Sequence, residues 1–368
     1  MRTIVRATAV GICLLAPSFS VAAQDPAPVA PKPEAKRPNA ADLYLTAVST
    51  LPVTLGVESE FDIQLPEVLG DDERERRYEE KGWDEMATKV ASELGLFAQA
   101  AHTADCAFAP EPDGWLSCDT KIIPLYSLVQ ITAANGFLRL RKKSFDAALH
   151  DASTLLASSR QFGQQPSTSA MALGSQVELS GIALLRAVLE VEDTLEPSTR
   201  KKAADMLEHH ARTRPGRRAA AGGIRTEVHR LLSGLAAEVE ATSAEAGTAF
   251  DDQQRLLRDH FEAIAQRVDE RLEHWLAPLL AGDDVPLADL LTRVDANLKA
   301  ARAKVADLKA LTKKRDRTEA QVLDALADSF VTLLLANPKA IVQNDAYSRD
   351  EFATCRRLVA ADRPDDGK

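Results

Sequence analysis

The chain has 368 residues, a formal net charge of −10, and a composition that is 45% hydrophobic, 27% charged and only 5% aromatic. Its length fits two or more domains. The acidic balance argues against partners with dense negative charge, such as nucleic acid or anionic lipid surfaces, and the scarcity of aromatic residues argues against a stacking platform for bases.

The first residues have the pattern of a secretory signal peptide. Two arginines are followed by an apolar run from Ala7 to Ala16, and small residues at 21–23 precede Gln24. A basic start, a short apolar run and small residues at the cleavage site define such a signal. We therefore expect residues 1–23 to be removed, the protein to be periplasmic or secreted in a bacterium, and the mature chain to have no transmembrane segment.

The next segment, residues 24–38, contains five prolines in fifteen positions. Proline-rich segments adopt extended conformations and do not build a core. We expect this segment to be a disordered linker between the cleavage site and the first folded element.

Beyond the linker, apolar residues recur at the three- and four-residue spacing of amphipathic helices, and most prolines fall between these stripes. No long run alternates with a period of two, so the predicted fold class is all-α. The stripes of the first half lie at 83–97, 122–140, 149–156 and 177–188.

The stripes of the second half are longer and are flanked by charged residues. They lie at 224–239, 257–279 and 287–308, and "GDDVP" at 282–286 provides a turn between the last two. Spacing this regular predicts a long antiparallel helical bundle or coiled-coil-like hairpin.

These patterns divide the folded part of the chain into three regions. The predicted organisation is a helical-hairpin domain at 39–215, a long-helix bundle at 216–336, and a C-terminal helix with a disordered tail at 337–368.

Two cysteines, Cys106 and Cys118, bracket the segment "AFAPEPDGWLS", which interrupts the helical pattern. In an oxidising compartment thiols usually pair, and the prolines and the Asp-Gly pair turn the chain back on itself. We predict a Cys106–Cys118 disulfide, with Asp113, Gly114 and Trp115 as a candidate interaction loop.

The alternative for the same cysteines is a zinc site. His102 lies four residues before Cys106, so a helix ending between them could bring both side chains to one metal, with Cys118 as a third ligand. No fourth ligand is evident nearby. We therefore expect no metal and no cofactor.

Three carboxylates, Glu58, Glu60 and Asp62, alternate in "VESEFDI", so an extended strand would place them on one face. Paired carboxylates perform acid–base catalysis or bind cations. They make a cell-envelope hydrolase the alternative function, although a solvated edge explains the pattern equally well.

Ser198 and Lys201 match the SxxK motif of penicillin-binding enzymes. The companion motifs of those enzymes are absent, so no catalytic residue is assigned here. Because Ser198 follows Pro197 at a predicted helix start, we expect its side chain to cap the helix.

The interval 200–230 is locally basic. Such a surface could dock an acidic partner or pair with the protein's own acidic residues. We expect the second, because helices this charged normally have a balancing neighbour.

The segment "GFLRLRKKSFDAALHDA" resembles part of a tetratricopeptide hairpin. Gly136, Phe145 and Ala148 fall at the small, aromatic and small positions of that motif. Thr132 and Asn135 occupy positions where the motif has bulky residues, and no second copy follows at its repeat length of about 34 residues.

Over residues 39–190 the chain is similar to uncharacterised exported bacterial all-helical proteins. The matching features are "NAA-x-x-Y" at 39–44, a cysteine before Asp113-Gly114, and a hairpin that ends at 148–156. The resemblance implies an exported helical protein and implies no activity. The predicted function is therefore a non-enzymatic helical scaffold, or a module that binds another protein or a peptide.

Overall fold

In the computed structural model of the protein, the described residues are 38–51, 83–108, 124–165, 167–191, 195–215, 217–246, 259–280, 285–311, 318–334 and 338–361. Several predicted features lie outside these ranges: the signal peptide, most of the linker, the carboxylates Glu58, Glu60 and Asp62, the loop of Asp113, Gly114 and Trp115, and Cys118.

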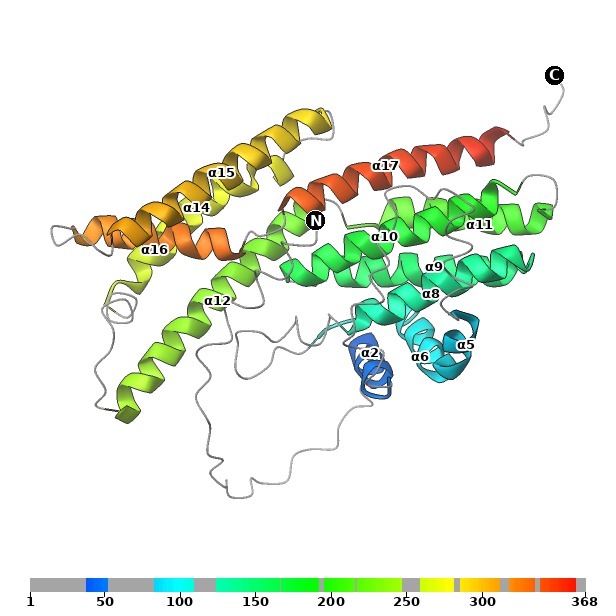
Figure 1. Cartoon of the computed structure of the whole chain (residues 1–368), viewed down its shortest axis with the longest axis horizontal. Helices are drawn as coiled ribbons and strands as arrows, with labels where there is room; N and C mark the ends of the chain where they lie inside the picture. Colours follow the sequence, from blue (N-terminus) through cyan, green and yellow to red (C-terminus); the bar gives the residue numbers. More distant parts are fainter. Residues whose placement is uncertain are drawn as a thin grey trace. The chain divides into compact units, whose positions relative to one another are not determined.

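The described residues form twelve helices and no strand, which confirms the predicted all-α fold (Figure 1). The helices are α2 (Ala40–Ser49), α5 (Trp83–Lys89), α6 (Ala91–Ala101), α8 (Leu125–Arg141), α9 (Phe145–Gly163), α10 (Thr168–Leu189), α11 (Pro197–Thr213), α12 (Arg217–Ala246), α14 (Phe261–Leu280), α15 (Leu287–Leu311), α16 (Glu319–Leu334) and α17 (Pro338–Ala361).

The stripe predicted over 83–97 is interrupted. Val90, which is fully buried, leaves helical geometry with φ −111° and ψ 27°, and separates α5 from α6. The interruption lets both short helices pack against α8, where Val90 joins Ile131 and Leu138 in a small apolar cluster. A spacing rule assumes one straight helix and so cannot reveal this bend.

A tight turn joins α8 to α9. The N–H of Ser144 donates to the carbonyl of Arg139 at 2.8 Å, and the N–H of Lys143 donates to that of Leu140 at 2.9 Å. These two bonds define a Schellman motif, in which the residue after the cap adopts the left-handed conformation. Lys143 occupies that position with φ 57°, where glycine is usual.

Helix α10 packs against α8, α9, α11, α12 and α17 (Figure 1). The approach to α9 is so close that a Cβ added at Gly174 would lie 2.7 Å from the backbone nitrogen of Gly163. The contact is between two backbones, so neither side can move away.

Within the described ranges, one stretch is long and apolar enough to cross a membrane, which the apolar spacing did not indicate. It is Ala170–Leu189 within α10, with a mean hydropathy of 1.3 and 61% of it buried within the fold. A helix enclosed by neighbours is apolar on all sides, as a membrane helix is. The apolar composition of α10 therefore follows from its central position, and is weak evidence for a membrane span.

The described side chains form two main apolar cores. The first core is built by α2, α6, α8, α9, α10, α11 and the second half of α17. The second core is built by α12, α14, α15 and α16, with Met171 of α10 and Val342 of α17. Helix α17 thus contributes to both, through Val342 at one end and Phe352 and Cys355 further along.

In the second core the buried positions differ slightly from the predicted stripes. Leu232 and Leu290 are buried, whereas Leu231 and Leu291, which the stripes include, are only partly buried. The coiled-coil-like packing of these helices and the domain boundaries at 215 and 336 stay predictions.

Candidate functional site

Two polar networks lie at the helix junctions of the first core. The first begins at Asn39, the N-cap residue of α2. Its side-chain amide donates to the carbonyl of Ala107 at 2.8 Å and accepts from the N–H of Ala107 at 2.9 Å. The side chain of Asn39 therefore makes the same pair of hydrogen bonds with the backbone of Ala107 that a neighbouring strand would make, although the two residues are 68 positions apart.

Tyr44 continues this network inside the core. Its side chain is fully buried, and its hydroxyl donates to Oε1 of Gln161 at 2.6 Å and lies 3.1 Å from Oγ of Ser158. Burial raises the pKa of Tyr44 far above its ordinary value, so the phenol stays protonated and keeps its donor role. The ring packs against Phe97 and Phe162, with centroid distances of 5.3 and 5.1 Å.

Two glutamines of α9 and its C-terminal end hold the segment that follows α6. Nε2 of Gln161 donates to the carbonyls of Ala100 at 3.1 Å and Thr103 at 2.8 Å. Nε2 of Gln165 donates to the carbonyl of Cys106 at 2.9 Å. Carbonyls at the end of a helix and just beyond it lack helical partners. The two glutamine amides donate to such carbonyls, at Ala100 in the last turn of α6 and at Thr103 and Cys106 after it.

The network fixes the backbone of Cys106 and leaves its thiol partly buried. Burial raises the pKa of the Cys106 thiol to about 12, so the reactive thiolate is scarce at neutral pH. Cys355, fully buried in α17, likewise has a pKa raised to about 12 by burial, and the two thiols form no disulfide with each other. Cys118 lies outside the described residues, so the Cys106–Cys118 disulfide stays a prediction.

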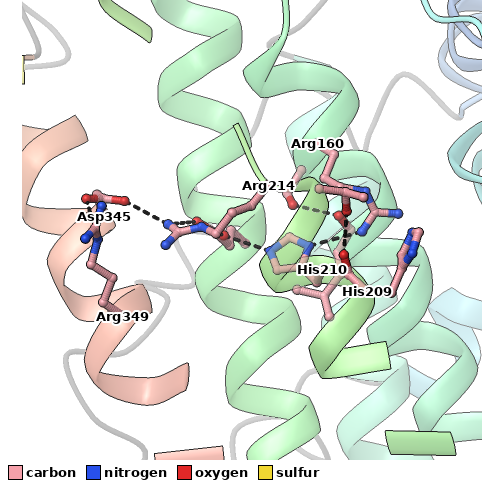
Figure 2. A network of polar contacts seen from close by, with 10 residues as sticks. Arg160, His209, His210, Arg214, Asp345 and Arg349 are labelled. Carbon is pink, nitrogen blue, oxygen red and sulfur yellow. Dashed lines mark hydrogen bonds and ion pairs between the residues drawn. The ribbon is translucent and has the colours of Figure 1, made fainter. Parts of the chain in front are cut away.

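The second network is a chain of charged and polar side chains that joins α9, α10, α11 and α17 (Figure 2). Nη1 of Arg160 lies 3.1 Å from Nδ1 of His210, and Nε2 of His210 lies 2.7 Å from Oε1 of Glu178. Nη2 of Arg214 donates to Oε2 of Glu178 at 3.0 Å and to Oδ1 of Asp345 at 2.8 Å.

The second network ends on α17, where Nε of Arg349 donates to Oδ2 of Asp345 at 3.0 Å. Nε of Arg214 lies 2.8 Å from Oε1 of Glu178 but makes no aligned hydrogen bond, so this contact is electrostatic. The side chains of Glu178 and Asp345 are only 9% and 11% exposed, so their charges interact in a region of low dielectric.

The partners of His210 settle its protonation. A guanidinium can only donate, so Nδ1 of His210 accepts from Arg160, and Nε2 carries the proton donated to Glu178. Burial lowers the pKa of His210, against the opposing effect of Glu178, and the charges of Arg160 and Arg214 lower it further. The neutral imidazole is therefore the form that the network holds.

Glu178 stays ionised within the network. Burial alone would raise its pKa, but the hydrogen bond from His210 and the charge of Arg214 outweigh burial and lower it. The pairing of a carboxylate with a histidine is also the orienting half of a catalytic triad. Here the other ring nitrogen faces Arg160 rather than a nucleophile, and His210 is fully buried, so the arrangement joins α9, α10 and α11.

Two other histidines and the basic interval 200–230 make contacts within the protein itself. His102 and His150 stack with ring centroids 5.9 Å apart, and no metal-binding group of three or more His, Cys, Asp or Glu residues occurs among the described residues. Several basic residues of 200–230 pair with the protein's own carboxylates, as expected: Lys201 with Asp205, Lys202 with Asp146, Arg212 with Glu208, Arg214 with Glu178 and Asp345, and Arg225 with Glu273.

The capping role expected for Ser198 is wrong. Helix α11 has Glu196 as its N-cap residue and Pro197 in its first turn, and no side chain caps it. Ser198 instead lies 3.4 Å from the carboxylate of Glu196. With proline at the first helical position, the helix starts two residues earlier than the serine pattern suggested.

Sequence reasoning missed the residues that build both networks. Gln161, Glu178 and Asp345 lie within helices, Gln165 lies just beyond the end of α9, and none of the four matches a motif. One signal was available, because Glu178 lies within the long apolar stretch Ala170–Leu189, and an ionisable residue in such a place needs a partner.

Comparison of the chain with protein-family models, with curated proteins and with solved structures gives no match.

Proposed function

We propose that this chain is an exported helical scaffold that binds another protein or a peptide and performs no catalysis. The observation that carries the proposal is the use of the buried ionisable groups. Glu178, His210, Arg214 and Asp345 are committed to one another across three helices, so they stabilise an arrangement of helices and are not available to a substrate.

The proposal includes a tetratricopeptide-like role for the hairpin of α8 and α9. A Cβ at Gly136 would lie 2.3 Å from Cδ2 of Leu184 on α10 and 3.3 Å from Cβ of Asp151 on α9, so a small residue stands at a crowded position where that motif also has one. Ala148 is fully buried, and Phe145 packs against the first core. By analogy alone, such hairpins present surfaces to peptides and proteins.

A selection from a displayed peptide library tests the binding role. We expect peptides with a shared pattern to be enriched by the purified protein and to bind it with one-to-one stoichiometry and a Kd of about micromolar, typical of modest peptide interfaces. No enrichment, together with hydrolysis of cell-envelope polymers that a Glu58→Gln, Glu60→Gln, Asp62→Asn variant loses, would instead establish the hydrolase alternative.

Export and the disulfide are tested together by mass. The native protein should lack residues 1–23, and without reductant Cys106 and Cys118 should be found in one cross-linked pair of peptides. A native species that retains residues 1–23, or Cys106 that reacts with an alkylating agent before reduction, contradicts the corresponding part of the proposal.

A further inference from the structure

Arg160 stands at the end of the second network with most of its hydrogen-bonding capacity unused. The side chain is partly buried on α9, and Nη1 donates to Nδ1 of His210 at 3.1 Å. A guanidinium has five N–H donors. Within the described ranges, no acceptor faces the other four of Arg160.

Arginines on α8 and α10, the helices that pack against α9, have different partners. Arg139 donates to both carboxylate oxygens of Asp151 at 2.7 and 2.8 Å. Arg186 donates to both oxygens of Glu351 at 3.0 Å. Each of these cations is matched by a carboxylate, as Arg214 is, whereas the described side-chain partner of Arg160 is a neutral imidazole.

Among the described residues, no carboxylate contacts Arg160 directly, and the ionised Glu178 lies on the far side of the His210 ring. Its charge acts on the pKa values of His102, which follows α6, of His210 on α11, and of Tyr44 on α2. Burial lowers the pKa of Arg160 itself, and Tyr44, which opposes this effect, is protonated at neutral pH. Arg160 is partly withdrawn from water without a carboxylate in direct contact among the described residues, and this costs free energy that a bound anion would offset.

We infer that Arg160 is the centre of a binding site for a small oxyanion, a carboxylate or a phosphate, at the junction of α9, α11 and the segment after α6. The planar guanidinium suits two oxygen atoms of either group at once. Its contact with His210 fixes the position of the fork, so the site is organised before the anion arrives. The inference concerns small anions and does not depend on the peptide binding proposed above.

Titration with inorganic phosphate tests the site. Purified protein is heated in rising phosphate, with chloride keeping the ionic strength constant, and a parallel series uses acetate to represent carboxylates. We expect at least one of the two anions to raise the Tm by about 2 °C or more at saturation, since a ligand that binds only the folded state stabilises it.

Two variants and one spectroscopic signal make the test specific. Arg160→Gln should abolish the rise in Tm, whereas Arg212→Gln should retain it, because the Arg212 side chain on α11 is 70% exposed and pairs only with Glu208 in the described structure. In the wild-type protein, the bound anion should also shift the imidazole NMR signals of His210. A wild-type protein whose Tm and His210 signals ignore both anions, or an Arg160→Gln protein with an undiminished response, overturns the inference.

Discussion

The two cores of this protein are held together in different ways. Helices of the first core are joined by polar side chains that are almost fully buried, such as Tyr44, Glu178 and His210, and by the close backbone approach at Gly174. In the second core the helices meet mainly through apolar side chains, and the described ion pairs between α14 and α16 range from Asp324, which is 51% exposed, to Asp328, which is 11% exposed and pairs with Arg271. The first core therefore uses a connected polar network to join four helices, whereas the second relies more on the burial of apolar surface, with a local group of ion pairs between α14 and α16.

The largest expected effect comes from placing a charge in the second core. Val294 of α15 is 2% exposed. Val294→Asp should destabilise the protein by about 4–5 kcal/mol, because the carboxylate would be buried without a partner. Denaturant unfolding measures the change, and Ala296→Asp, on the exposed face of the same helix, should cost less than about 1 kcal/mol. Equal effects at the two positions would show that the apolar stripe of α15 does not face a core.

The next effect separates the buried network from the edge of the second core. Glu178→Gln should destabilise the protein by about 3–5 kcal/mol, because Arg214 keeps its charge in a buried place and loses its main carboxylate. Asp324→Asn, which removes an exposed partner of Arg267 and Arg271, should cost no more than about 1 kcal/mol. If the first change were as mild as the second, the polar network would not be what specifies the first core.

Glycine replacements sharpen the same contrast. Gly174→Ala should destabilise by about 1–3 kcal/mol, because the added methyl group would meet the backbone of α9. Gly222→Ala on α12 should instead stabilise by about 0.5–1 kcal/mol, because open space surrounds that position and alanine favours helix. Thermal unfolding of both variants measures the change in Tm, which should fall for Gly174→Ala and rise for Gly222→Ala. Changes of the same sign would contradict the prediction.

The protonation of His210 predicts how stability depends on pH. Its pKa in the folded protein lies below the ordinary value of 6.5, so the unfolded chain takes up a proton first as the pH falls. Stability is therefore complete above about pH 6.5 and is lost below it, with a slope of at most about 1.4 kcal/mol per pH unit from this residue.

His210→Gln should reduce that slope below about pH 6.5, although it lowers the overall stability. The same substitution at His209, the exposed neighbour on α11, should leave the contribution of His210 in place. Stability curves of the two variants against pH decide the matter; an identical slope for wild type and His210→Gln would mean that the buried imidazole is not the titrating group.

The smallest effect concerns the turn between α8 and α9. Lys143→Gly should stabilise the protein by up to about 1 kcal/mol, because glycine adopts φ 57° without the steric cost that a Cβ imposes. Lys142→Gly, one residue earlier and with φ −76°, should not stabilise. Stabilisation by both changes would indicate that the lysine charges, rather than the backbone, determine the effect.

The helical class and most helix positions could be predicted from the sequence, because they depend on local spacing. The stripe at 149–156 lies in α9, and the stripe at 287–308 lies in α15. The bend at Val90 could not be predicted, since it arises from the way α5 and α6 share the surface of α8. The apolar composition of α10 is explained only by the helices that surround it, and the sequence does not show which helices these are.

The candidate site could be predicted far less well, because its residues meet across long stretches of chain. Tyr44 and Gln161 are 117 positions apart, and Arg214 and Asp345 are 131 apart. No spacing rule reaches over such distances. The loop of Asp113, Gly114 and Trp115, which the sequence favoured, lies outside the described residues, and the network came instead from polar residues inside apolar helices.

The position of α17 has a consequence for the order in which the molecule can fold. Phe352 and Cys355 complete a core whose first members are Ala40 and Ala41, and Val342 completes the other. Neither hydrophobic core can therefore close around a growing chain until its last helix has left the ribosome. Long-range closure of this kind slows folding, so the newly made polypeptide stays open for as long as its synthesis lasts.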